Sequence, residues 1–190
     1  MKINKEYRIA HIQPQENEND LIVEGYAIVF EQPTVLYEID GVQYKEIIDR
    51  NALVGTDMSD VPFKYNHSNE NFVLARTRNK TLELIPDEKG LFIRANLADV
   101  TAGNDLHKLI QRRDIDKMSF GFSIAEDNYD SLTHTRRILK IKKLYDVSAV
   151  SEPAYDGTSI SARDYFSVQE ELIKAKKKEM ERQKLILMTY

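Results

Sequence analysis

The chain has 190 residues, of which 42% are hydrophobic, and this is enough for one globular domain with a continuous core. Charged residues make up 31% and the net charge is only −4, which argues against a nucleic-acid-binding domain with clustered Lys and Arg. The absence of cysteine excludes disulfides and thiolate metal sites, and no segment approaches the ~20 apolar residues of a membrane span. We therefore expect a soluble cytosolic protein.

The first part of the chain predicts strands joined by turns. Residues 22–30 mix β-branched and aromatic side chains around Gly25, which indicates a strand with a bulge or a close backbone approach. Residues 35–48 form two partly alternating runs. Asp40-Gly41 lies between these runs, and this dipeptide is a good signal for a two-residue hairpin turn.

The middle of the chain begins with a short helix predicted over residues 50–56. Residues 61–65 contain a proline, which is typical of an edge strand or a strand start, and they lead into a polar Asn-His-Ser-Asn loop. Three strand-like runs follow, and Asp-Glu-Lys-Gly marks a turn between the last two. These runs are residues 72–78, 81–87 and 90–98.

The last part of the chain contains two predicted helices and further strands. Residues 104–113 carry leucine and isoleucine at helical spacing. Strands are expected over 118–125, 137–144 and 147–150, and a charged amphipathic helix over 168–187, which either projects or contacts a partner. We therefore expect one domain at residues 1–167 and a charged helix or tail at 168–190. The strands do not alternate with helices, so a mainly β (α+β) fold is favoured over a doubly wound sheet.

Serine chemistry requires a base that accepts the hydroxyl proton, and histidine is the usual base near neutral pH. His11, His107 and His134 lie in polar or surface-prone segments, where we expect them to be solvated. His67 lies at the end of a predicted strand in a polar loop, a setting in which scaffolds present reactive groups. An ordinary loop histidine is an equal alternative for it. Ser119, taken alone, is best interpreted as a serine at a helix-to-strand junction, bonded to backbone.

Paired carboxylates would point to a metal site or a glycosidase. Asp57, Asp60, Asp114 and Asp116 match no ligand spacing, and solvated loops are the better interpretation. The nucleotide-binding motifs G-x-x-x-x-G-K-[ST] and G-x-G-x-x-G and the zinc motif H-E-x-x-H are absent from the sequence. We therefore expect no cofactor and no metal.

The order of several segments resembles the prohead serine protease family of tailed bacteriophages, across residues 24–163. Each segment is weak alone, and their combination in this order is specific. They are GYAIVF, YKEIIDRNAL, KYNHSNENFVLART, the hairpin TLEL…DEKGLFIRANL, a helix leading into MSFGF, and DVSAVSEPAY. One departure lies outside the chemistry, because Arg50 or Asn51 stands where the family has a glycine.

This resemblance implies a serine endopeptidase with Ser119 as the nucleophile and His67 as its base. It makes Asp146 the third catalytic residue, with an ion pair to Lys142 or Lys143 as the alternative role. It also implies a fold like the herpesvirus capsid-maturation protease, an antiparallel β-barrel surrounded by helices. The arginine expected after the third residue has no counterpart in residues 151–154, so no oxyanion donor is assigned.

The resemblance also implies the partners of the chain. The substrates would be the major capsid protein's extension or a scaffold, and the chain itself, cut inside the assembling prohead in the host cytoplasm. No nucleic acid, membrane or cofactor is expected, and a homo-oligomer stays open. The competing interpretation is a non-catalytic β-barrel protein of the same fold that binds scaffold or assists capsid assembly.

Overall fold

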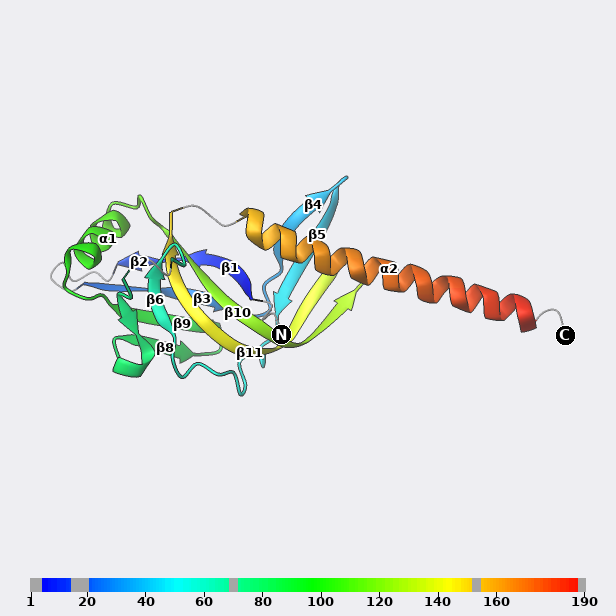
Figure 1. Cartoon of the computed structure of the whole chain (residues 1–190), viewed down its shortest axis with the longest axis horizontal. Helices are drawn as coiled ribbons and strands as arrows, with labels where there is room; N and C mark the ends of the chain where they lie inside the picture. The colour runs from blue at the N-terminus through cyan, green and yellow to red at the C-terminus, as the bar shows by residue number, and fades with distance from the viewer. Residues whose placement is uncertain (1–4, 15–20, 69–71, 152–154, 188–190) are drawn as a thin grey trace.

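The structure is a computed structural model that describes residues 5–14, 21–68, 72–151 and 155–187, with side chains of the last helix described from 164 to 184. The described chain is mainly β, with two α-helices and one short 3-10 helix (Figure 1). The first strands are β1 (Glu6–His11), β2 (Gln13–Pro14), β3 (Ile22–Val29), β4 (Thr34–Ile39), β5 (Val42–Ile48), β6 (Pro62–Tyr65) and β7 (Ala75–Arg76). After η1 (Thr77–Asn79) come β8 (Leu82–Pro86), β9 (Gly90–Asn96), α1 (Thr101–Gln111), β10 (Lys117–Asp130), β11 (Thr135–Val150) and α2 (Tyr155–Leu187).

The strands form two sheets that share one stretch of chain. The larger sheet has the order β1-β10-β11-β5-β4, with β6 pairing both β11 and β7, and the smaller has the order β2-β3-β9-β8. β10 and β11 form a long curved hairpin that runs through the whole larger sheet. β1 pairs with β10, and the chain then continues into β2, which pairs with β3 of the other sheet. The N-terminal segment therefore joins the two sheets.

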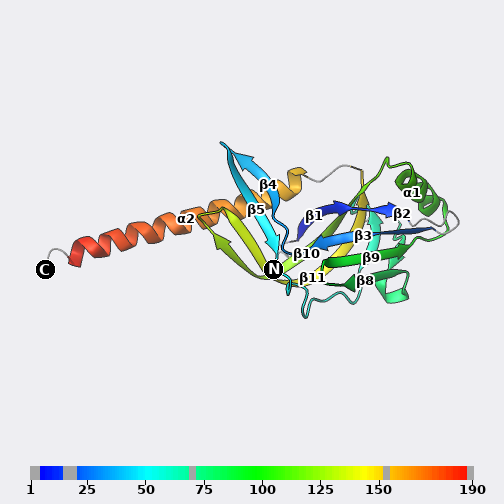
Figure 2. The ribbon, with the colours of Figure 1, turned by 180° about the vertical axis from the view of Figure 1, so that it is seen from behind.

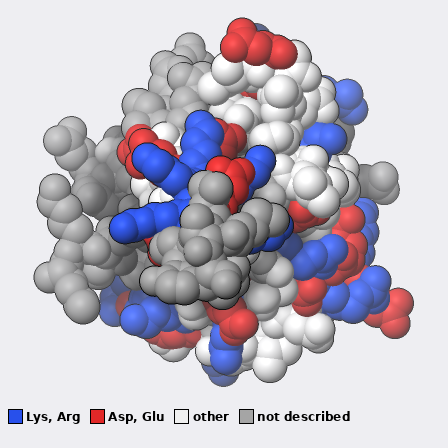
Figure 3. All heavy atoms as spheres, turned by 90° about the vertical axis from the view of Figure 1, so that its right-hand side faces the viewer, with Lys and Arg blue, Asp and Glu red and all other residues white. Residues whose placement is uncertain are grey.

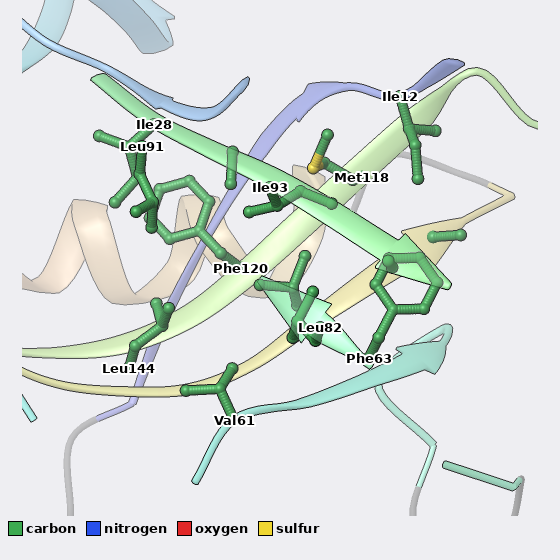
Figure 4. Packing of buried hydrophobic residues seen from close by; sticks show 14 of the residues in the cluster. Ile12, Ile28, Val61, Phe63, Leu82, Leu91, Ile93, Met118, Phe120 and Leu144 are labelled. Atoms are coloured by element: carbon green, nitrogen blue, oxygen red, sulfur yellow. The ribbon is translucent and has the colours of Figure 1, made fainter. Parts of the chain in front are cut away.

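The hydrophobic core lies where residues of both sheets meet (Figure 4). Met118 and Phe120 of β10 enter the same cluster as Leu91 and Ile93 of β9, and all four side chains are almost fully buried. Since side chains alternate along a strand, Ser119, which lies between Met118 and Phe120, projects to the opposite face of β10. Core packing thus decides which face of the larger sheet carries Ser119.

The predicted Asp40-Gly41 hairpin and the predicted close approach at Gly25 are confirmed. Asp40 and Gly41 connect β4 to β5 with φ values of 49° and 79°, as a type I′ turn requires. A Cβ atom on Gly25 would lie 2.4 Å from the carbonyl oxygen of His11, so the crossing of β1 and β3 needs glycine there. A bulge follows between Tyr26 and Ile28.

Other predicted elements differ from the structure. Residues 50–56 form successive turns instead of a helix. Their backbone N–H groups donate hydrogen bonds to carbonyl groups only three residues earlier, as from Val54 N to Asn51 O. The predicted strand over 72–78 shortens to β7, since Thr77 begins η1. The predicted helix at 104–113 is confirmed as α1, which begins earlier, at Thr101.

The mainly β, α+β class is confirmed, whereas the antiparallel barrel is not. β11 pairs in parallel with β5 near its start and with β6 near its end, so the larger sheet is mixed. Over the described ranges both sheets stay open, because β1 passes into β2 and links them instead of closing one sheet on itself. Two helices flank these sheets without surrounding them (Figure 2).

α2 begins at Tyr155, well before the predicted start at 168. Its first part packs on the sheet, where Phe166 is 1% exposed and contacts the rings of Tyr37, Tyr44 and Tyr129. From Glu171 onward the described side chains of α2 are exposed, and the helix extends away from the sheets (Figures 1 and 2). Viewed from its far end, the molecule shows basic and acidic side chains intermixed (Figure 3). None of the helices described has the length and apolarity to cross a membrane.

A buried network of charges joins β1 to α2. Arg8 Nε donates to Glu46 Oε1 over 2.6 Å and its Nη2 donates to Glu6 Oε2 over 2.7 Å. Arg136 Nη1 donates to the same Glu6 carboxylate over 3.0 Å, and its guanidinium lies 3.8 Å from the ring centroid of Tyr165. Burial lowers the pKa of Arg8, but the carboxylates of Glu46 and Glu6 outweigh burial and raise the pKa above its ordinary value.

Candidate active site

Ser119 is the third residue of β10, so it lies inside a strand and not at the junction that the sequence suggests. Its neighbours Met118 and Phe120 point into the core, and Ser119 therefore projects to the other face of the sheet. Its side chain is fully buried, yet its Oγ has no hydrogen-bond partner among the described residues. The expected bond to backbone is absent. An unpaired buried hydroxyl costs stability, which is typical of a group kept for chemistry.

The register of β10 and β11 places Asp146 near Ser119. Ser148 lies directly opposite Ser119 and Asp146 directly opposite Gly121, without a bulge between these pairs. Residues opposite each other in an antiparallel pair share a face, so all of these side chains project from the same face. Ser119 and Asp146 are diagonal neighbours, a relation that typically corresponds to about 7–8 Å between Cα atoms.

A tight turn after β6 brings His67 to this face. β6 runs parallel to β11, and Ser68 N donates to Tyr65 O over 3.1 Å. The two central residues of this turn, Asn66 and His67, have φ values of 51° and 53°, as in a type I′ turn. Asn66 Oδ1 accepts from Ser151 N over 3.0 Å, which ties the turn to the end of β11. The left-handed backbone of a non-glycine residue costs on the order of 1 kcal/mol, and functional sites often hold such strain.

His67 and Asp146 are hydrogen bonded through His67 Nδ1 and Asp146 Oδ1. Because an ionised carboxylate can only accept, Nδ1 carries the proton and Nε2 of the neutral ring is the unprotonated nitrogen. Nε2 is buried and has no hydrogen-bond partner among the described residues. The imidazole is thus held in the tautomer that a general base needs.

The other oxygen of Asp146 pairs with Lys5, just before β1. Burial raises the pKa of Asp146, but the hydrogen bonds and charges of His67 and Lys5 outweigh burial and hold this pKa below its ordinary value. The alternative role predicted for Asp146 is an ion pair with Lys142 or Lys143. This prediction is wrong for Lys143, whose Nζ donates to Asp57 over 2.7 Å. The two contacts of Asp146 both come from segments remote in the chain.

Sequence reasoning missed Lys5, Tyr7 and Ser148. The ring of Tyr7 lies 4.3 Å from that of His67, centroid to centroid, and Ser148 Oγ is a second buried hydroxyl without a partner in the described structure. A single signal was available for Tyr7, namely its alternation in β1 with Glu6 and Arg8, which point the other way into the charge network. No local pattern marks Lys5.

The remaining histidines make no hydrogen bond with the groups of this site within the described residues, although His11 is a diagonal neighbour of Ser119 across β1 and β10. His11 is exposed, as expected, and His134 Nδ1 is hydrogen bonded to the hydroxyl of Tyr129 at 3.1 Å. The expectation of a solvated His107 is wrong, because α1 packs with this residue inward and leaves it 4% exposed. Burial lowers the pKa of His107, which favours its neutral form.

The four candidate carboxylates form ion pairs rather than a cluster. Asp57 pairs with Lys143 and Asp60 with Arg76, and each of the other two pairs with a near neighbour in sequence, namely Asp114 with Arg112 and Asp116 with Lys117. No group of three or more metal-type ligands occurs within the described parts of the chain. These contacts agree with the interpretation of the carboxylates as surface groups.

Asp146 is expected to make the stability of the fold depend on pH. Its native pKa lies below 3.8, so its contribution is present above pH 3.8 and is lost as the pH falls through the native value. The pKa of Lys5 is raised above 10.5, so its contribution is present below pH 10.5 and is lost above it. Asp146→Asn should therefore flatten the acid side of the curve of unfolding free energy against pH, measured by urea unfolding.

The matched control is Asp116→Asn, which removes an exposed carboxylate at the start of β10. This control should keep the steep acid side of the parent curve. An Asp146→Asn curve as steep as that of the parent below pH 3.8 would contradict the ionic role of Asp146.

A mainly β domain that holds a histidine with a carboxylate, beside a buried serine on the same sheet face, contains the groups that serine-protease chemistry requires. The profile of the caudovirus prohead serine protease family matches residues 7–176. The chain belongs to this family of caudovirus prohead serine proteases.

The chain is similar to one curated protein and to one solved structure. The chain is 30% identical over 142 residues to the prohead protease of Enterobacteria phage HK97, covering 74% of this chain and 59% of that relative. It thus spans less than two thirds of the length of the relative. The bacteriophage T4 capsid assembly protease aligns in structure with a TM-score of 0.44 and 15% identity, over 79% of this chain and 99% of that one.

Proposed function

We propose that this chain is a serine endopeptidase in which Ser119 is the nucleophile, His67 the general base and Asp146 the residue that orients His67. The observation that carries the proposal is the His67–Asp146 pair, because it leaves an unprotonated and unpartnered Nε2 in the sheet face that also carries Ser119. Both serines lie in the range that matches the serine protease family, and the resemblance supports Ser119 over Ser148 because it implies the serine of the MSFGF segment as the nucleophile.

The proposed reaction is peptide-bond hydrolysis in two steps. Ser119 Oγ attacks the carbonyl carbon while His67 Nε2 accepts the hydroxyl proton, and the same proton then passes to the departing amine. A water molecule next attacks the acyl-enzyme, gives a proton to His67, and Ser119 recovers it as the ester bond breaks. Asp146 stabilises the imidazolium formed in both steps. The oxyanion donors are not assigned, and residues 152–154 lie outside the described residues.

The proposed substrates are the extension of the major capsid protein or a scaffold protein, and the chain itself, inside the assembling prohead. The family description and the name of the HK97 relative support this proposal. A homo-oligomer, the resemblance to the herpesvirus protease fold, and the division into residues 1–167 and 168–190 remain predictions. The exposed far part of α2 suits a contact with such an assembly.

Burial of Ser119 has a consequence for activity. The side chain is 0% exposed, so a substrate reaches Oγ only after the residues that cover it move. Such opening adds a free-energy cost to every turnover, which lowers the apparent rate in proportion to the open fraction. We therefore expect slow turnover by the isolated chain.

A fluorophosphonate probe tests the proposal directly, because it modifies only serines activated by a base. We expect slow labelling of Ser119, located by mass spectrometry of peptides. Labelling should vanish in Ser119→Ala and fall strongly in His67→Ala. Ser148→Ala is the matched control, since Ser148 is equally buried, unpaired and directly opposite Ser119, and it should still be labelled.

The same experiment separates the protease from the non-catalytic assembly factor. Labelling that survives in Ser119→Ala but disappears in Ser148→Ala would transfer the nucleophile to β11. A chain that stays unlabelled, even after incubation with coat protein and scaffold, would favour the binding protein.

A further inference from the structure

We infer that Lys5 is a positioning residue of this site, which fixes Asp146 and weakens the hold of His67 on a proton. The inference rests on the proposed roles of His67 and Asp146. It adds a fourth residue, from the segment that precedes β1, to the groups that determine the chemistry of Ser119.

The first support is the division of the Asp146 carboxylate between two partners, the ammonium group of Lys5 and the imidazole of His67. Oδ1 contacts His67 Nδ1 and Oδ2 contacts Lys5 Nζ, while the Asp146 side chain is 3% exposed. A carboxylate held at both oxygens cannot rotate without losing one charge-assisted bond. Lys5 therefore keeps the acceptor of His67 in one orientation.

The second support is the space that the sheet leaves for Lys5. A Cβ atom on Gly121 would lie 2.5 Å from Lys5 Cε and 2.9 Å from Tyr7 Cε1. Gly121 is directly opposite Asp146, so the absence of a side chain at Gly121 leaves the space that the end of Lys5 occupies beside the carboxylate. The Lys5 side chain, which is 28% exposed, thus packs against Gly121 on the strand that carries Ser119.

Aromatic rings complete the surroundings of the lysine. Lys5 Nζ lies 4.9 Å from the ring centroid of Tyr7 and 5.3 Å from that of Tyr145, at distances suited to cation–π attraction. The titratable groups around Lys5 are thus Tyr7 from β1, Tyr145 and Asp146 from β11, and His67 beyond Asp146. Of these groups, Asp146 contacts both Lys5 and His67, and protonation of its carboxylate would weaken both contacts.

The charge of Lys5 has a definite effect on His67. A positive charge on the far oxygen of Asp146 opposes a second positive charge on the imidazole ring. Protonated His67 is therefore less favourable with Lys5 present than without it. The outcome is an imidazole that stays neutral, with Nε2 free to accept the proton of Ser119, over a wider range of pH.

The test is a titration of the His67 ring by NMR in the full chain carrying Ser119→Ala, which needs no activity and prevents self-cleavage. In Lys5→Met the midpoint of the His67 titration should move upward by about one pH unit. Lys5→Arg keeps the charge and should keep the midpoint. Lys117→Met is the matched control, because this partly exposed lysine of β10 pairs with Asp116 instead, and it should leave the midpoint unchanged.

A second variant, Gly121→Ala, disturbs the position of Lys5 without changing its charge. Gly121→Ala should displace the end of Lys5 and raise the midpoint in the same direction, and adding Lys5→Met to it should cause little further change. An unchanged midpoint in folded Lys5→Met, or an equal shift in Lys117→Met, would overturn the inference. Either result leaves the assignment of Ser119 untouched, since probe labelling of the parent chain decides that question separately.

Discussion

Replacing Ser119 with alanine is expected to abolish cleavage of the capsid or scaffold protein, with a loss of up to about 10⁶-fold in kcat if chemistry limits the rate. The fold should survive, because the Oγ atom that is removed makes no hydrogen bond in the described structure. Removing an unpaired buried hydroxyl relieves a desolvation cost, so the unfolding free energy should stay equal to that of the parent or rise slightly. A dead enzyme with undiminished stability is the expected signature.

The measurement is the mass of all products when the chain is expressed with its matching coat protein, for the parent and for Ser119→Ala. It reports substrate cleavage and self-cleavage together. Ser148→Ala serves as the control for loss of a buried hydroxyl at the opposite position of β11 and should still produce the cleaved masses. Processing by Ser119→Ala at the parent rate would refute the assignment of the nucleophile.

Glu46→Gln is expected to cause the largest loss of stability away from the site. The change leaves the buried guanidinium of Arg8 without the carboxylate that binds two of its nitrogens, while Glu6 is shared with Arg136. Breaking a buried ion pair by removing one partner costs about 3 kcal/mol or more. For a domain of this size that loss lowers the melting temperature by roughly 10 °C.

Calorimetry or thermal unfolding measures this effect. Glu24→Gln is the matched control, because Glu24 faces Arg94 at 3.4 Å on the surface, and an exposed pair contributes less than about 1 kcal/mol. The double variant Arg8→Met with Glu46→Leu should recover much of the loss, since neither charge is then left alone in the core. Equal losses in Glu46→Gln and Glu24→Gln would contradict the role of the buried network.

The network and the candidate site are connected through one strand. β1 directs Glu6 and Arg8 to the buried charges beneath α2 and directs Tyr7 to the ring of His67 on the other face. Lys5 precedes these residues directly. The position of β1 is therefore set from both faces of the larger sheet, and the same short segment contributes to the anchoring of α2 and to the candidate site.

Features of the sequence predicted several strands, one hairpin turn, the family and the candidate site residues of this protein. β-Branched and aromatic side chains marked β3, strand-like runs marked β9 and β10, and Asp40-Gly41 marked a hairpin turn because these residues accept positive φ. The ordered Asn-His, MSFGF and DVSAV segments indicated the family and singled out Ser119, His67 and Asp146. The strands and the turn are readable because each depends on residues a few positions apart, whereas the family signal depends on the order of segments along the chain.

Only the tertiary structure decided which remote groups meet. His67 and Asp146 are 79 residues apart and Lys5 and Asp146 are 141 residues apart, and their contacts follow from β1 and β6 lying beside the β10–β11 hairpin. The parallel pairing of β11, the burial of His107 and the early start of α2 likewise depend on packing. Strand order, and the face on which each side chain emerges, come from long-range contacts of the whole core, which a local pattern does not encode.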